Sequence, residues 1–184
     1  MHKTISIGAE DFILGCLPPD GTMRAMASPS SEYFEKLPRT EWRECDMSSL
    51  VPIVYHQGRF ASCASHCAAM TLMLARAVAG KHAVPLSPTF AYGMLNFGID
   101  RGTTVTACMI VMCETGDVTL RDMGADTIRI ADGKMGHLLE VASNYRLVNR
   151  IGLEDFDAMC STLTLGHPIA FGIGVGKTLN KVDK

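Results

Sequence analysis

The sequence has no long apolar run, no basic cluster and no internal repeat, and each absence excludes a class of protein. No stretch approaches the roughly 18 apolar residues that a membrane-spanning helix needs, so we expect no membrane contact. Its 17 basic residues are balanced by 19 acidic ones, for a net charge of −2, and form no basic face. We therefore expect no nucleic-acid partner. Residues 1–15 contain acidic side chains and no long apolar core, so we also expect no secretory signal.

The composition is that of a globular protein. Of the 184 residues, 47% are hydrophobic and 20% are charged, which is enough for one domain or for two small halves that share a core. Proline, glycine and serine punctuate residues 1–40, which predicts an irregular N-terminal arm. We place the domain at residues 41–184.

The seven cysteines are odd in number, and several lie in apolar helical patterns. This indicates buried free thiols in a reducing compartment more than a disulfide framework. Cys63, His66 and Cys67 would share one helix face, at spacings that suggest metal ligands. They do not complete a tetrahedral site, so we expect no metal and no cofactor.

The expected secondary structure places the helices first. A helix is predicted over residues 63–79, with Ser62 as N-cap and Gly80 as the left-handed residue that ends it. Its side chains are apolar on nearly every face, which is typical of a buried helix. The other expected elements are an extended 49–55, helices at 87–98, about 103–116 and 155–165, and strands at 145–151 and 168–175. This order predicts an α+β fold.

The segment from Gln57 to Cys63 carries the main chemical signal. A cysteine at the start of a buried helix is usually just a small buried residue. The helix dipole and the unpaired N–H groups there also favour a thiolate, which is the reactive form of cysteine. Gln57 lies across a glycine turn and could donate a second hydrogen bond to an oxyanion. One short segment thus offers the start of an acyl-transfer site.

The segment around Cys63 resembles the active-site segment of the papain-like cysteine peptidases, and seven other segments agree in order. The Q-G-x-x-x-S-C pattern at 57–63 is preceded by a Trp-Arg pair and by a P-I-V-Y-H-Q-G segment similar to one in the bacterial and viral branch. In this sequence the matching pieces are residues 14–20, 41–43, 52–58, 86–92, 102–118, 145–147 and 165–173. Around the cysteine only Ser62 and Cys63 match the family's C-G-[SA]-C-[WY] signature, because Ala61 and Ala64 replace a glycine and an aromatic residue.

This resemblance implies a papain-like fold with a complete helical half and a truncated β half. It implies Cys63 as the nucleophile and Gln57 as an oxyanion donor. The family has its catalytic histidine and amide roughly 130–150 residues after the cysteine, or about positions 193–213 here, and the sequence ends at Lys184. None of His66, His137 and His167 matches a catalytic position of the family. We therefore expect weak or no activity from this polypeptide alone, unless a second chain supplies a histidine.

Two functions remain open after this comparison. The first is a thiol hydrolase acting on a peptide or protein, and the second is a non-catalytic assembly module on the same scaffold, for example in a viral particle. A zinc-binding helical domain is a weaker third. The resemblance leaves strand 168–175 with an unpaired edge, so we expect a partner chain or a second copy to cover Phe171, Ile173 and Val175. We expect the protein in the cytoplasm or within a viral particle.

Overall fold

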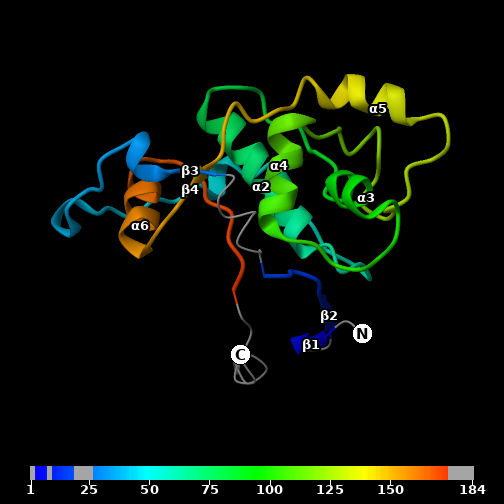
Figure 1. Cartoon of the computed structure of the whole chain (residues 1–184), viewed down its shortest axis with the longest axis horizontal. Helices are drawn as coiled ribbons and strands as arrows, with labels where there is room; N and C mark the ends of the chain where they lie inside the picture. Colours follow the sequence, from blue (N-terminus) through cyan, green and yellow to red (C-terminus); the bar gives the residue numbers. More distant parts are fainter. Residues whose placement is uncertain (1–2, 8–9, 19–26, 174–184) are drawn as a thin grey trace.

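The computed structural model describes residues 3–7, 10–18 and 27–173 and has an α+β fold, as the sequence predicts (Figure 1). The described β structure consists of two small two-stranded sheets, β1–β2 and β3–β4. In chain order the elements are β1 Lys3–Ile7, β2 Glu10–Leu14, β3 Ser28–Pro29, η1 Ser30–Glu32, η2 Arg39–Glu41, η3 Ser48–Leu50, α2 Cys63–Val78, α3 Phe90–Asn96, α4 Val105–Glu114, α5 Met135–Ala142, β4 Ile151–Gly152 and α6 Phe156–Thr164.

Helix α2 is the centre of the main core, as its apolar sequence predicts. Small and large side chains on α2, from Ala64 to Met73, are buried against Cys108, Val111 and Met112 of α4. Alanines at 64, 68 and 69 let the two helices approach closely, and Leu72 fills the space between them. The helix ends where Gly80 adopts a φ of 70°, a left-handed conformation that a glycine accepts without strain.

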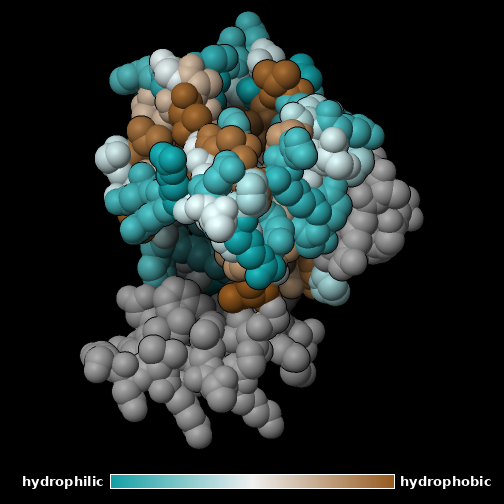
Figure 2. Space-filling view, turned by 90° about the vertical axis from the view of Figure 1, so that its left-hand side faces the viewer, coloured by the Kyte–Doolittle hydropathy of each residue, from teal (hydrophilic) through white to brown (hydrophobic). Residues whose placement is uncertain are grey.

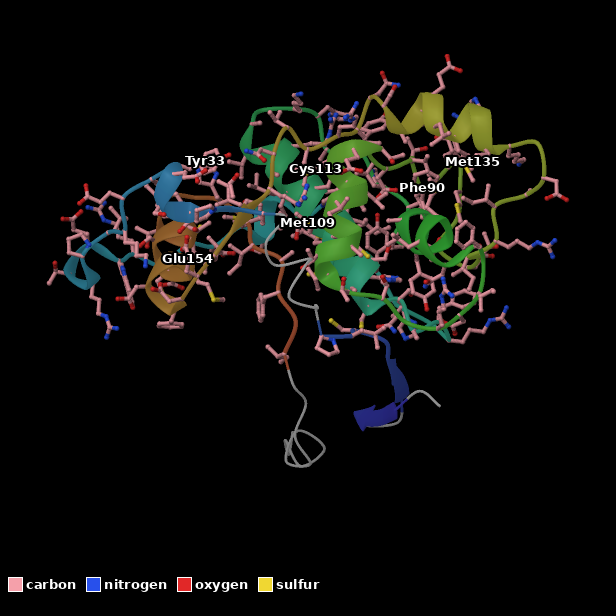
Figure 3. All side chains as sticks on the ribbon, in the orientation of Figure 1. Tyr33, Phe90, Met109, Cys113, Met135 and Glu154 are labelled. Carbon is pink, nitrogen blue, oxygen red and sulfur yellow. The ribbon has the colours of Figure 1, made fainter. Side chains whose placement is uncertain are left out.

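A second core lies between α3 and α5. Phe90 at the start of α3 packs with Val118, Met123 and Leu138, and Figure 3 shows Phe90 on the side of the molecule where α5 lies. The elements expected from the sequence include no helix around His137, but His137 lies within α5. Only one narrow stripe of α5 is buried, at Leu138 and Ala142, which leaves a weak periodic signal.

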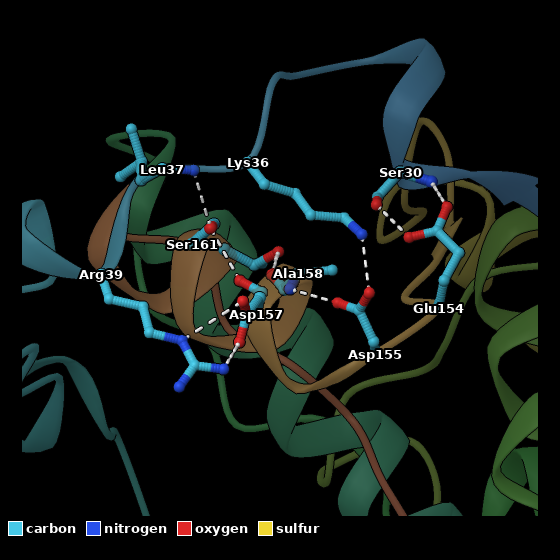
Figure 4. Close-up of polar contacts among 10 residues, drawn as sticks. Ser30, Lys36, Leu37, Arg39, Glu154, Asp155, Asp157, Ala158 and Ser161 are labelled. Carbon is cyan, nitrogen blue, oxygen red and sulfur yellow. Dashed lines mark hydrogen bonds and ion pairs between the residues drawn. The ribbon is translucent and has the colours of Figure 1, made fainter.

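Helix α6 forms a smaller lobe with the segment at residues 28–46 (Figure 4). Asp155 caps α6 by accepting from the N–H of Ala158 at 2.8 Å, and it also pairs with Lys36 at 2.7 Å. Ser161 Oγ accepts from the N–H of Leu37 at 3.0 Å, and Asn149 donates to the Tyr33 hydroxyl at 2.6 Å. Figure 3 shows Tyr33 and Glu154 within this lobe. Polar contacts between residues more than 100 positions apart therefore hold the lobe together.

The bounds predicted for the two strands in the second half of the chain were wrong. Of residues 145–151, only Ile151 is in a strand, where β4 pairs in parallel with β3. Residues 168–173 are extended but join no strand, and residues 174–175 lie outside the described residues. A strand needs ladder hydrogen bonds from a neighbouring strand as well as an apolar pattern, and among the described residues no strand pairs with this segment.

The N-terminal arm is more regular than the composition predicts. Within residues 1–40, β1 and β2 form an antiparallel hairpin in which Lys3 pairs with Leu14. The arm then follows the edge of the main lobe, where Leu17 N–H donates to Thr103 O at 2.8 Å. Among the described residues, we find no helix with the length and apolar character needed to cross a membrane.

Candidate active site

Cys63 is the first residue of α2 and is half-buried. The two residues before it, Ala61 and Ser62, are fully buried and fix the start of the helix. Ser62 was expected to cap α2 through its side chain, which it does not do, since its Oγ lies 3.3 Å from His66 Nδ1 instead. The backbone N–H of Cys63 is among the first of the helix and has no intrahelical acceptor.

A polar network anchors the segment that carries Cys63. The N–H of Ala61 donates to Asp100 Oδ1 at 3.0 Å, and the Tyr92 hydroxyl donates to the same oxygen at 2.6 Å. Burial and the bond to Asp100 raise the pKa of Tyr92 to about 12, so the phenol keeps its proton. The same hydroxyl accepts from the N–H of Gly102 at 2.7 Å. Tyr92 on α3 thus connects the loop at residue 102 with the segment before Cys63.

Gln57 is held inside the turn that precedes α2. Its Nε2 donates to the carbonyl of Phe60 at 2.6 Å. Gly58 has a φ of 64°, and its N–H donates to His56 Nδ1 at 3.0 Å, so two side chains close this turn. The amide of Gln57 therefore lies within the segment that leads to Cys63. Its role as an oxyanion donor stays a prediction.

An open depression of about 540 Å³ lies beside this turn. One wall is formed by residues 56–60, and the other by Leu120 and residues 124–126. The second wall is not predictable from the sequence, because no local pattern in residues 117–126 links these residues to the Gln57 turn. Leu120 is placed there through its N–H, which donates to Pro85 O at 2.8 Å.

No hydrogen bond among the described residues joins a histidine to Cys63. His66 directs Nδ1 at the carbonyl of Ser62, 3.0 Å away, while its Nε2 is buried without a hydrogen-bond partner. Burial lowers the pKa of His66 and favours the neutral ring. His137 lies 3.9 Å from Asp122, and the N–H of His167 donates to Thr162 O beside α6. His66, His137 and His167 therefore do not form a thiolate–imidazolium pair with Cys63.

Four thiols gather around the start of α2, namely Cys16, Cys63, Cys67 and Cys108. Burial, and then the neighbouring Cys63, raise the pKa of Cys16. Burial raises the pKa of Cys67 and takes that of Cys108 to about 12, so these two stay protonated at neutral pH. Within the described ranges, no three His, Cys, Asp or Glu side chains are arranged to hold a metal ion.

The N-terminal arm passes directly over this segment. Gly15 lies so close to Ala61 that a Cβ on the glycine would stand 1.8 Å from the Ala61 carbonyl oxygen. Its carbonyl accepts from the N–H of Thr103 at 2.9 Å, and Cys16 forms a parallel bridge with Thr103. Residues 14–20 are one of the pieces that resemble the family, but nothing in their sequence indicates this contact with the segment before Cys63.

Comparison with known proteins shows the fold. No protein-family model matches the sequence, and no curated protein matches it. Among solved structures, the chain is similar to xylellain, a cysteine protease from Xylella fastidiosa, with a TM-score of 0.56 and 16% sequence identity. The match covers 82% of this chain and 58% of xylellain. The chain thus has a papain-like α+β fold, with a helical half and a truncated sheet, and spans a little over half the length of that protease.

Proposed function

We propose that this chain carries the nucleophile half of a papain-like thiol hydrolase, with Cys63 as the nucleophile. The observation that carries the proposal is the place of Cys63, which is half-buried at the first residue of the buried helix α2, in a fold similar to a cysteine protease. The substrate class is a peptide or a protein, as the resemblance implies.

The chemistry follows from the start of the helix. A thiolate at residue 63 would be stabilised by the helix dipole and by N–H groups that lack intrahelical acceptors. It would attack a carbonyl carbon, and the oxygen of the tetrahedral intermediate would accept from the N–H of Cys63. Gln57 lies in the adjoining turn, held by its bond to Phe60, and would supply the second donor.

Turnover needs a group that the described residues do not bring to Cys63. A histidine must withdraw the thiol proton and later protonate the leaving amine. We infer that this histidine comes from a second chain or from a segment outside the described residues. Without it, Cys63 could be acylated slowly at most.

A second candidate is a non-catalytic assembly module, and the exposure of residues 165–173 favours it. Phe171 is 55% exposed and Ile173 67% exposed, on an extended segment without strand partners. An extended apolar edge can pair with another chain. Figure 2 shows that hydrophobic groups on the α6 side are scattered among hydrophilic ones. The proposed contact is therefore the 168–173 edge and not the α6 side. Light scattering that finds a monomer, with these side chains accessible to solvent, would exclude it.

The test of the hydrolase proposal is the alkylation rate of each cysteine. The reduced protein is treated with substoichiometric iodoacetamide between pH 5 and pH 9, and each site is quantified by mass spectrometry. We expect Cys63 to react fastest at each pH, because the start of a helix favours the reactive thiolate form of cysteine. Cys45 is exposed and belongs to no helix, so it serves as the internal reference.

The Cys63→Ala variant should lose the fast phase and keep the reaction at Cys45. If Cys63 reacts no faster than Cys45 across the pH range, the nucleophile assignment is wrong. The assembly module would then be the better description of the chain.

A further inference from the structure

Two cysteines meet at the starts of two helices. Cys63 begins α2, and the sulfur of Cys16 faces the backbone N–H of Val105, the first residue of α4. Cys63 is near enough to Cys16 to raise the pKa of Cys16, and Cys16 is exposed. They come from segments 47 positions apart, so the fold and not the local sequence brings them together.

The backbone holds Cys16 in this position from both sides. The residue before it, Gly15, lies against Ala61, and the residue after it, Leu17, donates to Thr103 O at 2.8 Å. An ideal Cβ on Gly172 would stand 2.9 Å from the Cys16 sulfur, so the chain at residue 172 closes a third side. Cys16 is therefore fixed over the segment that carries Cys63, while remaining open to small molecules in solvent.

We propose that Cys16 and Cys63 form a reversible disulfide when the protein meets a peroxide or a similar two-electron oxidant. The bond would fasten the N-terminal arm over the start of α2 and remove the free thiol of residue 63. A thiol reductant would restore both. The proposal needs Cys63 to react as a thiolate but not to turn over a substrate, so it stands apart from the hydrolase activity.

The other two thiols near Cys63 are poor partners. Cys67 is four residues along the same helix, where Cβ atoms are about 5–6 Å apart, whereas a disulfide needs about 3.5–4.5 Å. Bridging Cys63 and Cys67 would therefore unwind the first turn of α2. Cys108 is fully buried between α2 and α4, and burial raises its pKa to about 12. Cys16 is on a separate segment. The small backbone shifts that a disulfide with Cys63 would require there would leave α2 intact.

The chemical step takes place in two stages. The Cys63 thiolate attacks one oxygen of hydrogen peroxide, giving a sulfenic acid at Cys63 and releasing hydroxide. The Cys16 sulfur then attacks the Cys63 sulfur, and the sulfenic hydroxyl leaves as water with the thiol proton. Two thiols and one peroxide become one disulfide and two waters. Both sulfurs are oxidised and the peroxide is reduced.

The experiment maps the disulfide directly. The reduced full chain is treated with one to five equivalents of hydrogen peroxide, and the remaining thiols are blocked with iodoacetamide under denaturing conditions. Digestion with trypsin without reductant places Cys16 in peptide 4–24, and both Cys63 and Cys67 in peptide 60–76. We expect a linked pair of these peptides that disappears on reduction, with fragmentation that assigns the bond to Cys63.

Variants make the assignment independent of fragmentation. Cys67→Ser should still form the linked pair, whereas Cys16→Ser should not, and should accumulate sulfenic and sulfinic acid at Cys63. Cys45→Ser is the matched control and should behave as the parent protein. A linked pair that survives Cys63→Ser but not Cys67→Ser, or oxidation of Cys63 while Cys16 stays a free thiol, would overturn the proposal.

Discussion

Asp117 should make the stability of this protein fall as the pH rises. The residue is fully buried beside the main core, and its backbone N–H donates to Tyr145 O at 3.0 Å. One carboxyl oxygen accepts from the N–H of Val118 at 2.8 Å, and the other has no partner. Burial therefore raises the pKa of Asp117 well above its usual range, with only one weaker bond opposing the shift.

The sign of the effect follows from proton binding. Between the unfolded pKa of about 3.9 and the raised folded pKa, the folded state keeps a proton that the unfolded chain has released. The contribution of Asp117 to the free energy of unfolding is then fully present below about pH 4. This contribution decreases as the pH rises, by up to about 1.4 kcal/mol per pH unit. His66 acts in the opposite direction, because burial lowers its pKa and the unfolded chain binds the extra proton. Only a comparison between variants isolates Asp117.

The assay is urea unfolding of the parent protein and of Asp117→Asn at pH 4.5, 5.5 and 6.5. The asparagine keeps the acceptor for Val118 but cannot ionise, so the variant should gain on the parent by up to about 1.4 kcal/mol with each pH unit. Asp132→Asn, on an exposed turn, is the matched control and should follow the parent. A difference between Asp117→Asn and the parent that stays constant with pH would refute the reasoning.

Three further substitutions test other contacts. In Gly15→Ala the new Cβ would stand 1.8 Å from the Ala61 carbonyl oxygen, so the arm should move away from Ala61. The alkylation rate of Cys63 should then rise several-fold, whereas the control Gly136→Ala should leave that rate unchanged. Thr104 caps α4, because its side chain accepts from the Ala107 N–H. Thr104→Val removes this cap and should lower the free energy of unfolding, measured in urea, by about 1 kcal/mol. Ser161→Ala leaves the N–H of Leu37 without its acceptor and should cost about 1–3 kcal/mol in the same assay.

The helices with strong local signals could be predicted from the sequence, and the strands could not. Helices α2, α4 and α6 lie within two residues of their expected bounds, because a glycine follows each of them and Thr104 and Asp155 cap α4 and α6. The second expected helix begins at Phe90 instead of Ser87, since Pro88 and Thr89 form a turn before it. The alternating pattern at 145–151 and the apolar run at 168–175 predict strands, but strand formation depends on neighbours that a single sequence does not reveal.

The candidate site was predictable where it is local. The turn from Gln57 and the helix start at Cys63 are continuous in sequence, and both lie where the pattern indicates. The contacts that position them are not local. Asp100 binds the N–H of Ala61, and Gly15 lies on the same residue, although neither sequence neighbourhood indicates this. Where two backbones approach closely, the only sign in the sequence is a glycine. A single sequence does not show whether a glycine is needed for such an approach or for another purpose.

These contacts separate the reactivity of Cys63 from catalysis. The start of α2 is fixed by Asp100 and Tyr92, and both belong to the helical half of the molecule. The geometry that favours a thiolate therefore does not depend on the β half, whereas the proton transfers of hydrolysis depend on a histidine that no described residue provides. A fast-reacting Cys63 would consequently show an intact nucleophile segment without showing turnover. The proposed disulfide with Cys16 likewise needs no histidine, so the proposed oxidation and the proposed hydrolysis at Cys63 would be lost through different substitutions.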